Sequence, residues 1–176
     1  MNYAPFKFEK VSLKQYIEAW RKLGSVKSDE VLEEEWNNIK LPKRATKGSA
    51  GYDFFAPCDL GEITATPITI PTGIRWVTED DGLYLMMVPR SGLGFKYRFQ
   101  LFNTIGDIDC DYYHSDNEGH IFAKFLNGGN KRLELKQGDA FMQGVFLPYG
   151  ITYDDNTTKT RNGGMGSTDN SGEAKE

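Results

Sequence analysis

Short apolar segments separated by turn-forming residues run from residue 50 to residue 148, and this pattern constrains the fold more than any other. Glycine occupies 19 of the 176 positions and aromatic residues make up 13% of the chain, which is typical of a β-rich fold with tight turns. The strands that we expect cover residues 50–56, 63–70, 73–77, 83–88, 120–126, 132–135 and 140–148. Only a short helical turn after Ser91 interrupts them. The pattern therefore predicts an all-β sandwich or barrel, because strands and helices do not alternate as they do in a doubly wound sheet.

The N-terminal part of the chain has a different period. Residues 6–11 alternate apolar and polar side chains, which predicts a strand. Apolar side chains then recur at helical spacing, at Leu13, Tyr16, Ile17, Trp20 and Leu23. Ser12 and Gln15 fit a capping box at the start of this helix, and Gly24 is positioned to end it.

A second helix is expected after Ser28, which can act as its N-cap. Its apolar stripe lies behind an acidic run and consists of Val31, Leu32, Trp36 and Ile39. Residues 12–39 are therefore predicted to form a helical hairpin attached to the β domain. Two interpretations of this hairpin are open: Trp20 and Trp36 pack on the domain, or the hairpin is a docking surface for another subunit or protein.

The apolar pattern stops after Tyr149. Residues 152–176 are polar and rich in Asn, Thr, Gly and Ser, so they cannot bury enough surface to fold alone. We therefore expect a folded unit at residues 1–150, hairpin included, and a flexible C-terminal tail at residues 151–176. Within the tail, residues 161–168 hold an arginine, three glycines and two hydroxyls. Such a segment suits a mobile lid over a phosphate, although chance glycines in a floppy tail would look the same.

Charge and hydropathy exclude several classes of protein. The formal net charge of −4 provides no general attraction to nucleic acid or to an anionic membrane, so neither is expected as a partner. No apolar run approaches the roughly 20 residues of a membrane span. The N-terminus also lacks a basic-then-apolar signal pattern, and we expect a cytoplasmic protein.

Metal and disulfide sites are not indicated by the cysteines and histidines. Cys58 and Cys110 lack metal-ligand spacing, and we expect buried free thiols. His114 and His120 have no Cys or Glu at a zinc-site spacing, and we interpret both as surface or loop residues.

Three acids alternate with other residues at Asp107, Asp109 and Asp111. If the segment is extended, their carboxylates project from one face. Like charges so close repel, and no lysine or arginine lies between them. That arrangement suits a site that activates water or receives a metal-bound phosphate. The alternative is an edge strand or turn with solvated acids.

A phosphate-type turn precedes the acids. Pro89 ends an apolar strand, and Ser91 and Gly92 allow a tight turn into a short helix. Free N–H groups at such a turn favour an anion, and Arg90 adds a planar fork of donors. With the polar Gln143 inside the apolar run 141–147, these residues indicate a polyphosphate held between cationic groups and a metal. The Gly-x-x-x-x-Gly-Lys-Ser/Thr pattern of a P-loop is absent from the sequence.

Five motifs in sequence order resemble those of the trimeric dUTP pyrophosphatases (dUTPases). They are Ala50-Gly51-Tyr52-Asp53, Pro89-Arg90-Ser91-Gly92-Leu93, Asn103-x-x-Gly106-x-Ile108-Asp109-x-Asp111-Tyr112, Gly138-Asp139-x-x-x-Gln143, and Arg161 with Gly163-Gly164-x-Gly166-Ser167-Thr168. The resemblance spans residues 42–168. It implies a jelly-roll-like β barrel, a homotrimer with active sites at subunit interfaces, and Mg²⁺-dependent hydrolysis of dUTP to dUMP and pyrophosphate.

The same resemblance implies roles for residues of the third motif. Asp109 corresponds to the general base that activates a water for attack on the α-phosphate. Tyr112 corresponds to the ring under the deoxyribose that leaves no room for a 2′-hydroxyl. The uracil-reading groove corresponds to Asn103 and to the backbone of the following hairpin, with Gly106 and Ile108.

Phosphate and metal contacts are implied by the other motifs. The phosphate contacts correspond to Arg90, Ser91, Gly92 and Gln143. Asp53 corresponds to the acid associated with hydrated Mg²⁺ through water. The lid over a neighbouring subunit's site corresponds to Arg161, directed at the γ-phosphate, and to Gly164, Met165, Gly166 and Ser167. The family usually has a phenylalanine where this chain has Met165, so we expect a weaker or more mobile lid.

Two other functions are alternatives to dUTP hydrolysis. The dCTP deaminases share a similar Pro-Arg-Ser motif but use a glutamate in the strand that corresponds to residues 121–125, where this chain has no acid. The second alternative is a regulatory protein that binds a partner through the hairpin at residues 12–39.

Overall fold

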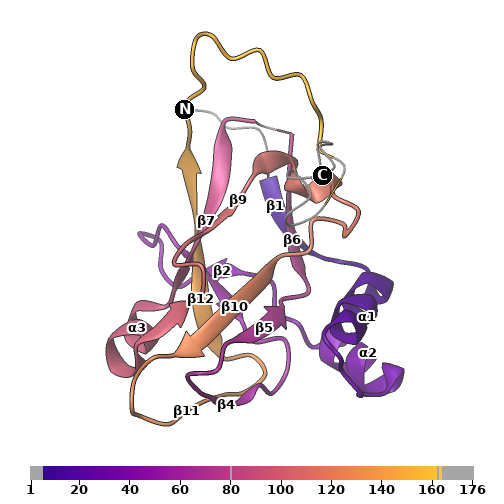
Figure 1. Cartoon of the computed structure of the whole chain (residues 1–176), viewed down its shortest axis with the longest axis vertical. Helices are drawn as coiled ribbons and strands as arrows, with labels where there is room; N and C mark the ends of the chain where they lie inside the picture. Colours follow the sequence, from indigo (N-terminus) through magenta and orange to yellow (C-terminus); the bar gives the residue numbers. More distant parts are fainter. Residues whose placement is uncertain (1–5, 80, 162, 164–176) are drawn as a thin grey trace, which may run out of the picture.

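The computed structural model describes residues 6–79, 81–161 and 163 of the chain (Figure 1). Its elements, in order, are β1 (Phe6–Lys10), α1 (Leu13–Lys22), α2 (Asp29–Asn37), β2 (Lys43–Arg44), β3 (Tyr52–Phe55), β4 (Gly61–Ile63), β5 (Ile68–Pro71), β6 (Ile74–Thr78), β7 (Leu83–Pro89), α3 (Ser91–Tyr97), β8 (Phe99–Leu101), β9 (Gly106–Ile108), the 3₁₀ helix η1 (Cys110–His114), β10 (Phe122–Asn127), β11 (Leu133–Leu135) and β12 (Ala140–Pro148). Strands dominate and helices are few, which confirms the expected fold class.

Antiparallel pairing organises the strands of the described residues into four sheets. The largest has the order β2-β3-β12-β7-β9, and a three-stranded sheet has the order β5-β10-β8. The pairs β1-β6 and β11-β4 complete the set. Strand β12 is the centre of the largest sheet, since it pairs with β3 on one side and with β7 from Met142↔Pro89 to Pro148↔Leu83 on the other.

The core lies between these sheets and combines aliphatic side chains with two groups of aromatic rings. Phe99 and Phe125 stack with their centroids 4.5 Å apart, and Phe125 meets Phe141 edge-on at 5.3 Å. A second group surrounds Phe146, whose ring contacts Trp76 at 5.1 Å. Burying each such side chain contributes about 1.5–3 kcal/mol, and the aromatic pairs add about 0.5–1.5 kcal/mol.

Helices α1 and α2 lie side by side along one flank of the barrel, as the sequence predicts for residues 12–39 (Figure 1). Ser12 caps α1, and its Oγ accepts the Gln15 N–H at 3.1 Å. The reciprocal bond of the expected capping box is made by a different residue: Glu118 accepts the Ser12 N–H at 2.8 Å and the Ser12 hydroxyl at 2.6 Å. Gly24 has φ +82° and ends the helix as expected.

Helix α2 fastens the hairpin to the first strand. Ser28 caps it and accepts the Val31 N–H, as predicted. The indole N–H of Trp36 donates to the Val11 carbonyl at 2.9 Å, and Leu32 is fully buried. Val31 is 43% exposed, so the apolar stripe that packs is narrower than expected.

The single strand that was expected at residues 63–70 is divided into two strands. Residues 63–70 divide into β4 and β5, which pair with β11 and β10 respectively. Pro67 lies in the break between them. Proline has no N–H to donate to a strand ladder, which is the physical reason for the interruption.

His120 lies in a loop, as predicted, but not at the surface. This side chain is fully buried, and its Nε2 accepts the Gly73 N–H at 2.8 Å. Burial lowers the pKa of His120 to about 3, so the imidazole is neutral. His114 is exposed as expected. Both cysteines are free, with Cys58 buried and Cys110 half-buried rather than buried.

Candidate active site

The acidic segment is not extended over its whole length. Strand β9 ends at Ile108 and the chain then enters η1, so the expected single strand face for the three carboxylates is wrong. Asp107, Asp109 and Asp111 nevertheless line one hollow of about 1010 Å³. Lys159 and Arg161 line its other side, so acids and tail face each other.

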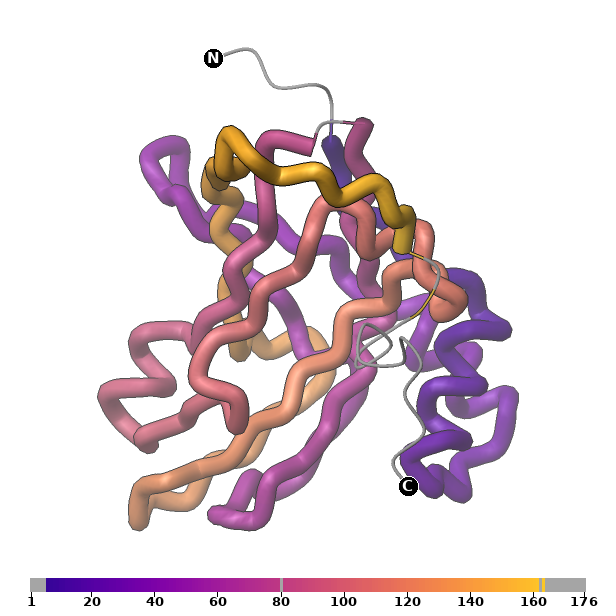
Figure 2. Tube along the Cα trace, turned by 45° about the horizontal axis from the view of Figure 1, so that its top comes forward, coloured from indigo at the N-terminus to yellow at the C-terminus, as the bar shows by residue number. Residues whose placement is uncertain are grey.

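Arg161 supplies the positive charge that the acidic segment lacks. The tail crosses the top of the barrel after β12 and ends its described part against η1 (Figure 2). Arg161 Nε donates to Asp111 Oδ1 at 2.8 Å, and its Nη2 forms an ion pair with Asp109 Oδ2. The guanidinium carbon lies 5.6 Å from the centroid of the Tyr112 ring. One arginine therefore offsets the repulsion between two carboxylates and covers an aromatic face.

A second pocket of about 350 Å³ gathers most of the predicted third motif. Its lining includes Asn103, Gly106, Ile108, Asp109, Tyr112 and Arg161. Tyr112 is buried, whereas the Asp109 side chain is 60% exposed and can be reached by water. Gly106 pairs with Met87, and a Cβ on Gly106 would lie 3.2 Å from the Met87 Cβ. The absence of a side chain at this position keeps the strand backbone close to its neighbour.

The predicted phosphate residues gather on adjacent strands of the largest sheet. Asp53 on β3 and Gln143 on β12 are register partners, and Gln143 Nε2 donates to Asp53 Oδ1 at 3.0 Å. Arg90 follows β7, and its Nε lies 3.9 Å from the same oxygen. Asp53 is buried while Arg90 is exposed. The group therefore presents a cationic donor to solvent above a buried, hydrogen-bonded carboxylate.

Two glycines lie in this group, Gly92 at the exposed start of α3 and Gly51 under the Gln143 side chain. Ser91 and Gly92 are exposed in the first turn of α3, which starts after Arg90 without a side-chain cap in the described structure. A Cβ on Gly51 would lie 3.0 Å from Gln143 Oε1. Residue 51 therefore fits under the Gln143 side chain because it is a glycine.

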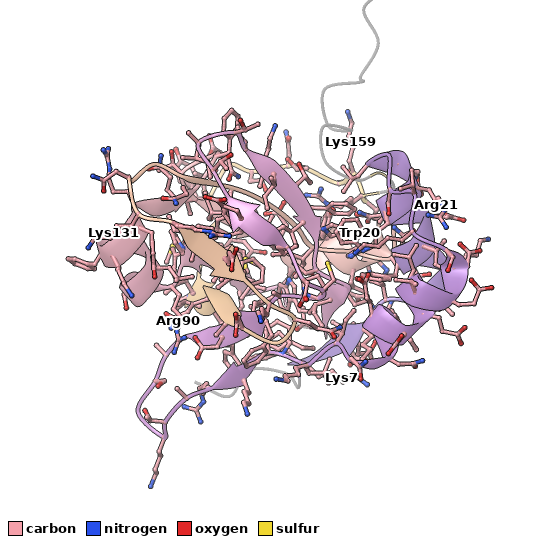
Figure 3. All side chains as sticks on the ribbon, turned by 90° about the horizontal axis from the view of Figure 1, so that it is seen from below. Lys7, Trp20, Arg21, Arg90, Lys131 and Lys159 are labelled. Carbon is pink, nitrogen blue, oxygen red and sulfur yellow. The ribbon has the colours of Figure 1, made fainter. Side chains whose placement is uncertain are left out.

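The two groups do not share a pocket within the described part of one chain. Neither pocket is lined by Asp53, Arg90 or Gln143. Met142 lines the smaller pocket, and the next residue, Gln143, projects from the opposite face because side chains alternate along a strand. Figure 3 shows Arg90 well apart from Lys159 of the tail. The predicted residues Gly164, Met165, Gly166 and Ser167 lie outside the described residues.

Sequence reasoning missed three residues at this site. Met87 and Met142 line the smaller pocket from β7 and β12. Asn117 donates from Nδ2 to the Tyr112 hydroxyl at 3.0 Å. Alternation along the two strands could have indicated the methionines, but the loop that carries Asn117 has no periodicity to interpret.

Residues 6–79, 81–161 and 163 show neither a preformed metal cage nor a membrane-spanning helix. They contain no group of three or more His, Cys, Asp or Glu side chains arranged to hold a metal ion. Among the same residues, no helix combines the length and the apolar character that crossing a bilayer requires.

Comparisons with known proteins agree on one family. The family model described as dUTPase matches residues 37–169. A deoxyuridine 5′-triphosphate nucleotidohydrolase of Lactococcus lactis is 38% identical over 133 residues, which cover 74% of this chain and 88% of the relative. The protein with the same name from Tolumonas auensis is 37% identical over 139 residues, which cover 75% and 89%.

Solved structures give the same result. A crystal structure of dUTPase from Streptococcus mutans aligns with a TM-score of 0.61 and 29% identity, and covers 83% of this chain and 98% of that one. A mutant dUTPase from phage phi11 of S. aureus, described as coordinating a structural Mg(II) ion, aligns with a TM-score of 0.60 and 15% identity over 88% and 97% of the two chains. The second likeness concerns the fold alone.

Proposed function

The chain belongs to the dUTPase family, and we infer from this membership that it is a dUTP diphosphatase, which hydrolyses dUTP to dUMP and pyrophosphate. One observation carries the assignment of the site. A single pocket is lined by Asn103, Gly106, Ile108, Asp109 and Tyr112, the residues that the third motif would use for base, sugar and water.

Asp109 is the general base of the proposed reaction. It accepts a proton from a water whose oxygen attacks the α-phosphorus of dUTP. The bond from that phosphorus to the bridging oxygen breaks, and pyrophosphate leaves with the bonding electrons. A carboxylate is an adequate base when it holds the water within hydrogen-bond reach, and the exposure of Asp109 supports access by water.

The smaller pocket receives the deoxyuridine. The backbone of residues 103–109 pairs with the polar edge of uracil, and Asn103 contributes to the same groove. The Tyr112 ring lies under the deoxyribose and excludes a 2′-hydroxyl. The burial of Tyr112 and its place in the pocket wall support this role.

Arg90, Ser91, Gly92 and Gln143 contact the phosphates. Magnesium keeps most of its water ligands and takes one or two carboxylates plus substrate phosphates, so it needs no protein cage. The Asp53 carboxylate, with a Gln143 hydrogen bond on one oxygen, fits such an outer role, and Asp53 would hold Mg²⁺ through water. When bound, the ion would neutralise charge on the triphosphate.

The complete site is shared between chains of a homotrimer. Support comes from the distribution of the two groups: the base and sugar residues line one pocket, and the phosphate residues stand on another face of the sheet. A neighbouring subunit that places its Arg90 and Gln143 at this pocket would complete it.

The tail closes the site of a neighbouring subunit. Arg161 exchanges its two carboxylate partners for the γ-phosphate, and Gly164, Met165, Gly166 and Ser167 cover the nucleotide. Arg161 contacts Asp109 and Asp111, which supports the view that the tail is long enough to reach such acids. Release of Asp109 from the arginine then frees the base for catalysis.

Pyrophosphate release from dUTP in the presence of Mg²⁺ tests the assignment. Asp109→Asn should lower turnover by about a hundredfold or more, because it removes the general base. Asp116→Asn, an exposed acid on the loop after η1, is the matched control and should retain activity. Equal loss in both variants, or full activity of Asp109→Asn, would contradict the role of Asp109. Ammonia released from dCTP would instead indicate a deaminase.

A partner-binding role of the hairpin has separate support. Leu23, Val26 and Val31 are apolar and exposed, and Val26 is 98% accessible. A protein partner that binds the native chain but not the triple variant Leu23→Ser, Val26→Ser, Val31→Ser would support docking at the hairpin. Equal retention by both proteins would count against it.

A further inference from the structure

The hydroxyl of Tyr112 is held from outside the pocket that its ring lines. The amide Nδ2 of Asn117 donates to this hydroxyl at 3.0 Å, and the hydroxyl donates to the His120 carbonyl at 3.3 Å. Neither Asn117 nor His120 is part of the pocket lining. The position of the ring therefore depends on groups that do not meet the nucleotide.

Asn117 is itself fixed within a tight loop. Its Oδ1 accepts the Gly119 N–H at 3.2 Å, and its Nδ2 also donates to the His120 carbonyl at 3.3 Å. Gly119 has φ +72°, and a Cβ there would lie 2.4 Å from the Tyr113 Cα. The loop backbone is thus packed directly against the residue that follows Tyr112.

Glu118 clamps the same loop to the helical hairpin. It has φ +59°, an uncommon conformation for a residue with a side chain. In that conformation its carboxylate accepts the Ser12 N–H and the Ser12 hydroxyl at 2.8 and 2.6 Å. The loop is consequently held at two consecutive residues: Asn117 bonds the Tyr112 hydroxyl, and Glu118 bonds the start of α1.

We propose that Asn117 is a positioning residue for sugar selection: by holding the Tyr112 hydroxyl it keeps the ring where a ribose 2′-hydroxyl would collide with it. The inference rests on the proposed function, in which Tyr112 lies under the deoxyribose. Loss of the hydrogen bond frees the ring to move away from the sugar. The movement should increase hydrolysis of UTP more than it decreases hydrolysis of dUTP.

A double-mutant cycle tests this role. Tyr112→Phe keeps the ring and removes the hydroxyl, and Asn117→Ala removes the amide. Each should raise the ratio of kcat/KM for UTP to kcat/KM for dUTP by at least about fivefold, the factor expected for one hydrogen bond. The double variant should show no rise beyond that of Tyr112→Phe, because the hydroxyl through which Asn117 acts is already absent. Asp116→Ala, an exposed neighbour, should leave the ratio unchanged.

The outcomes separate the inference from the function on which it rests. If the native enzyme cleaves dUTP and the ratio is unchanged in Tyr112→Phe, the inference is overturned and the function stands. If Asn117→Ala does not fold, Tyr112→Phe alone decides. Additive effects in the double variant would mean that Asn117 acts other than through the hydroxyl. Absence of dUTP cleavage by the native enzyme would overturn both.

Discussion

Acid should destabilise this protein through one buried histidine. Nε2 of His120 accepts the Gly73 N–H, and burial lowers the pKa of His120 from 6.5 to about 3. Tyr16, whose ring centroid lies 6.4 Å from the imidazole, has a pKa raised by burial and stays uncharged. It therefore offers no compensating charge to a protonated imidazole.

The size of the effect follows from the two pKa values of His120. Because the folded-state pKa is the lower one, the unfolded state takes up the proton first as the pH falls. The stabilisation is therefore complete above pH 6.5 and is lost progressively toward pH 3. Each pH unit in that window corresponds to about 1.4 kcal/mol. Between pH 7.5 and pH 5, His120 should remove about 2 kcal/mol from the free energy of unfolding.

Urea unfolding of the full chain at pH 7.5, 6 and 5, at one protein concentration, measures this loss. His120→Gln keeps an acceptor for the Gly73 N–H but cannot take up the proton. Between pH 7.5 and pH 5, the free energy of unfolding should therefore fall less in His120→Gln than in the native protein, and the difference should be about 2 kcal/mol. His114→Gln, at the exposed histidine, should keep the native slope. Parallel slopes in all three proteins would refute the reasoning.

Truncation of the tail tests its role in turnover, and a glycine substitution tests close packing at residue 129. Removing residues 150–176 should leave the melting temperature nearly unchanged but lower dUTP turnover at least about tenfold, because the proposed contact of Arg161 with the γ-phosphate is lost. Removing only residues 170–176, which lie beyond the family match, should preserve turnover. Unfolding of the longer truncation would contradict the separation of tail and core. Gly129→Ala should lower the free energy of unfolding by about 1–3 kcal/mol. A Cβ there would lie 2.5 Å from the Tyr97 carbonyl oxygen, whereas nothing lies within 4 Å of one at Gly48. Gly48→Ala is therefore the control, and equal urea midpoints for the two variants would exclude overpacking at residue 129.

Local signals in the sequence were sufficient for much of the fold. Ser12 and Ser28 cap the two helices, Gly24 ends the first of them, and β12 has the predicted bounds of 140–148. Each of these features depends on residues within one turn or one strand. Such short-range rules determine where an element starts and stops, and here they also identified the motifs that resemble the family.

Contacts across the chain could be decided only by the tertiary structure. Ser12 meets Glu118 across 106 residues, and Arg161 meets Asp109 across 52 residues. The burial of His120 was not predicted, because nothing in its neighbourhood in sequence reveals that Gly73 would donate to it. Asn117 was missed for the same reason.

Most candidate residues of the site could therefore be predicted from the sequence, whereas their grouping was decided by the fold. Alternation along β12 follows from local geometry, but which face of the sheet meets the Tyr112 pocket depends on how β7, β9 and β10 close around it. Closure is a balance of core packing over many strands, and no segment of the sequence encodes it alone.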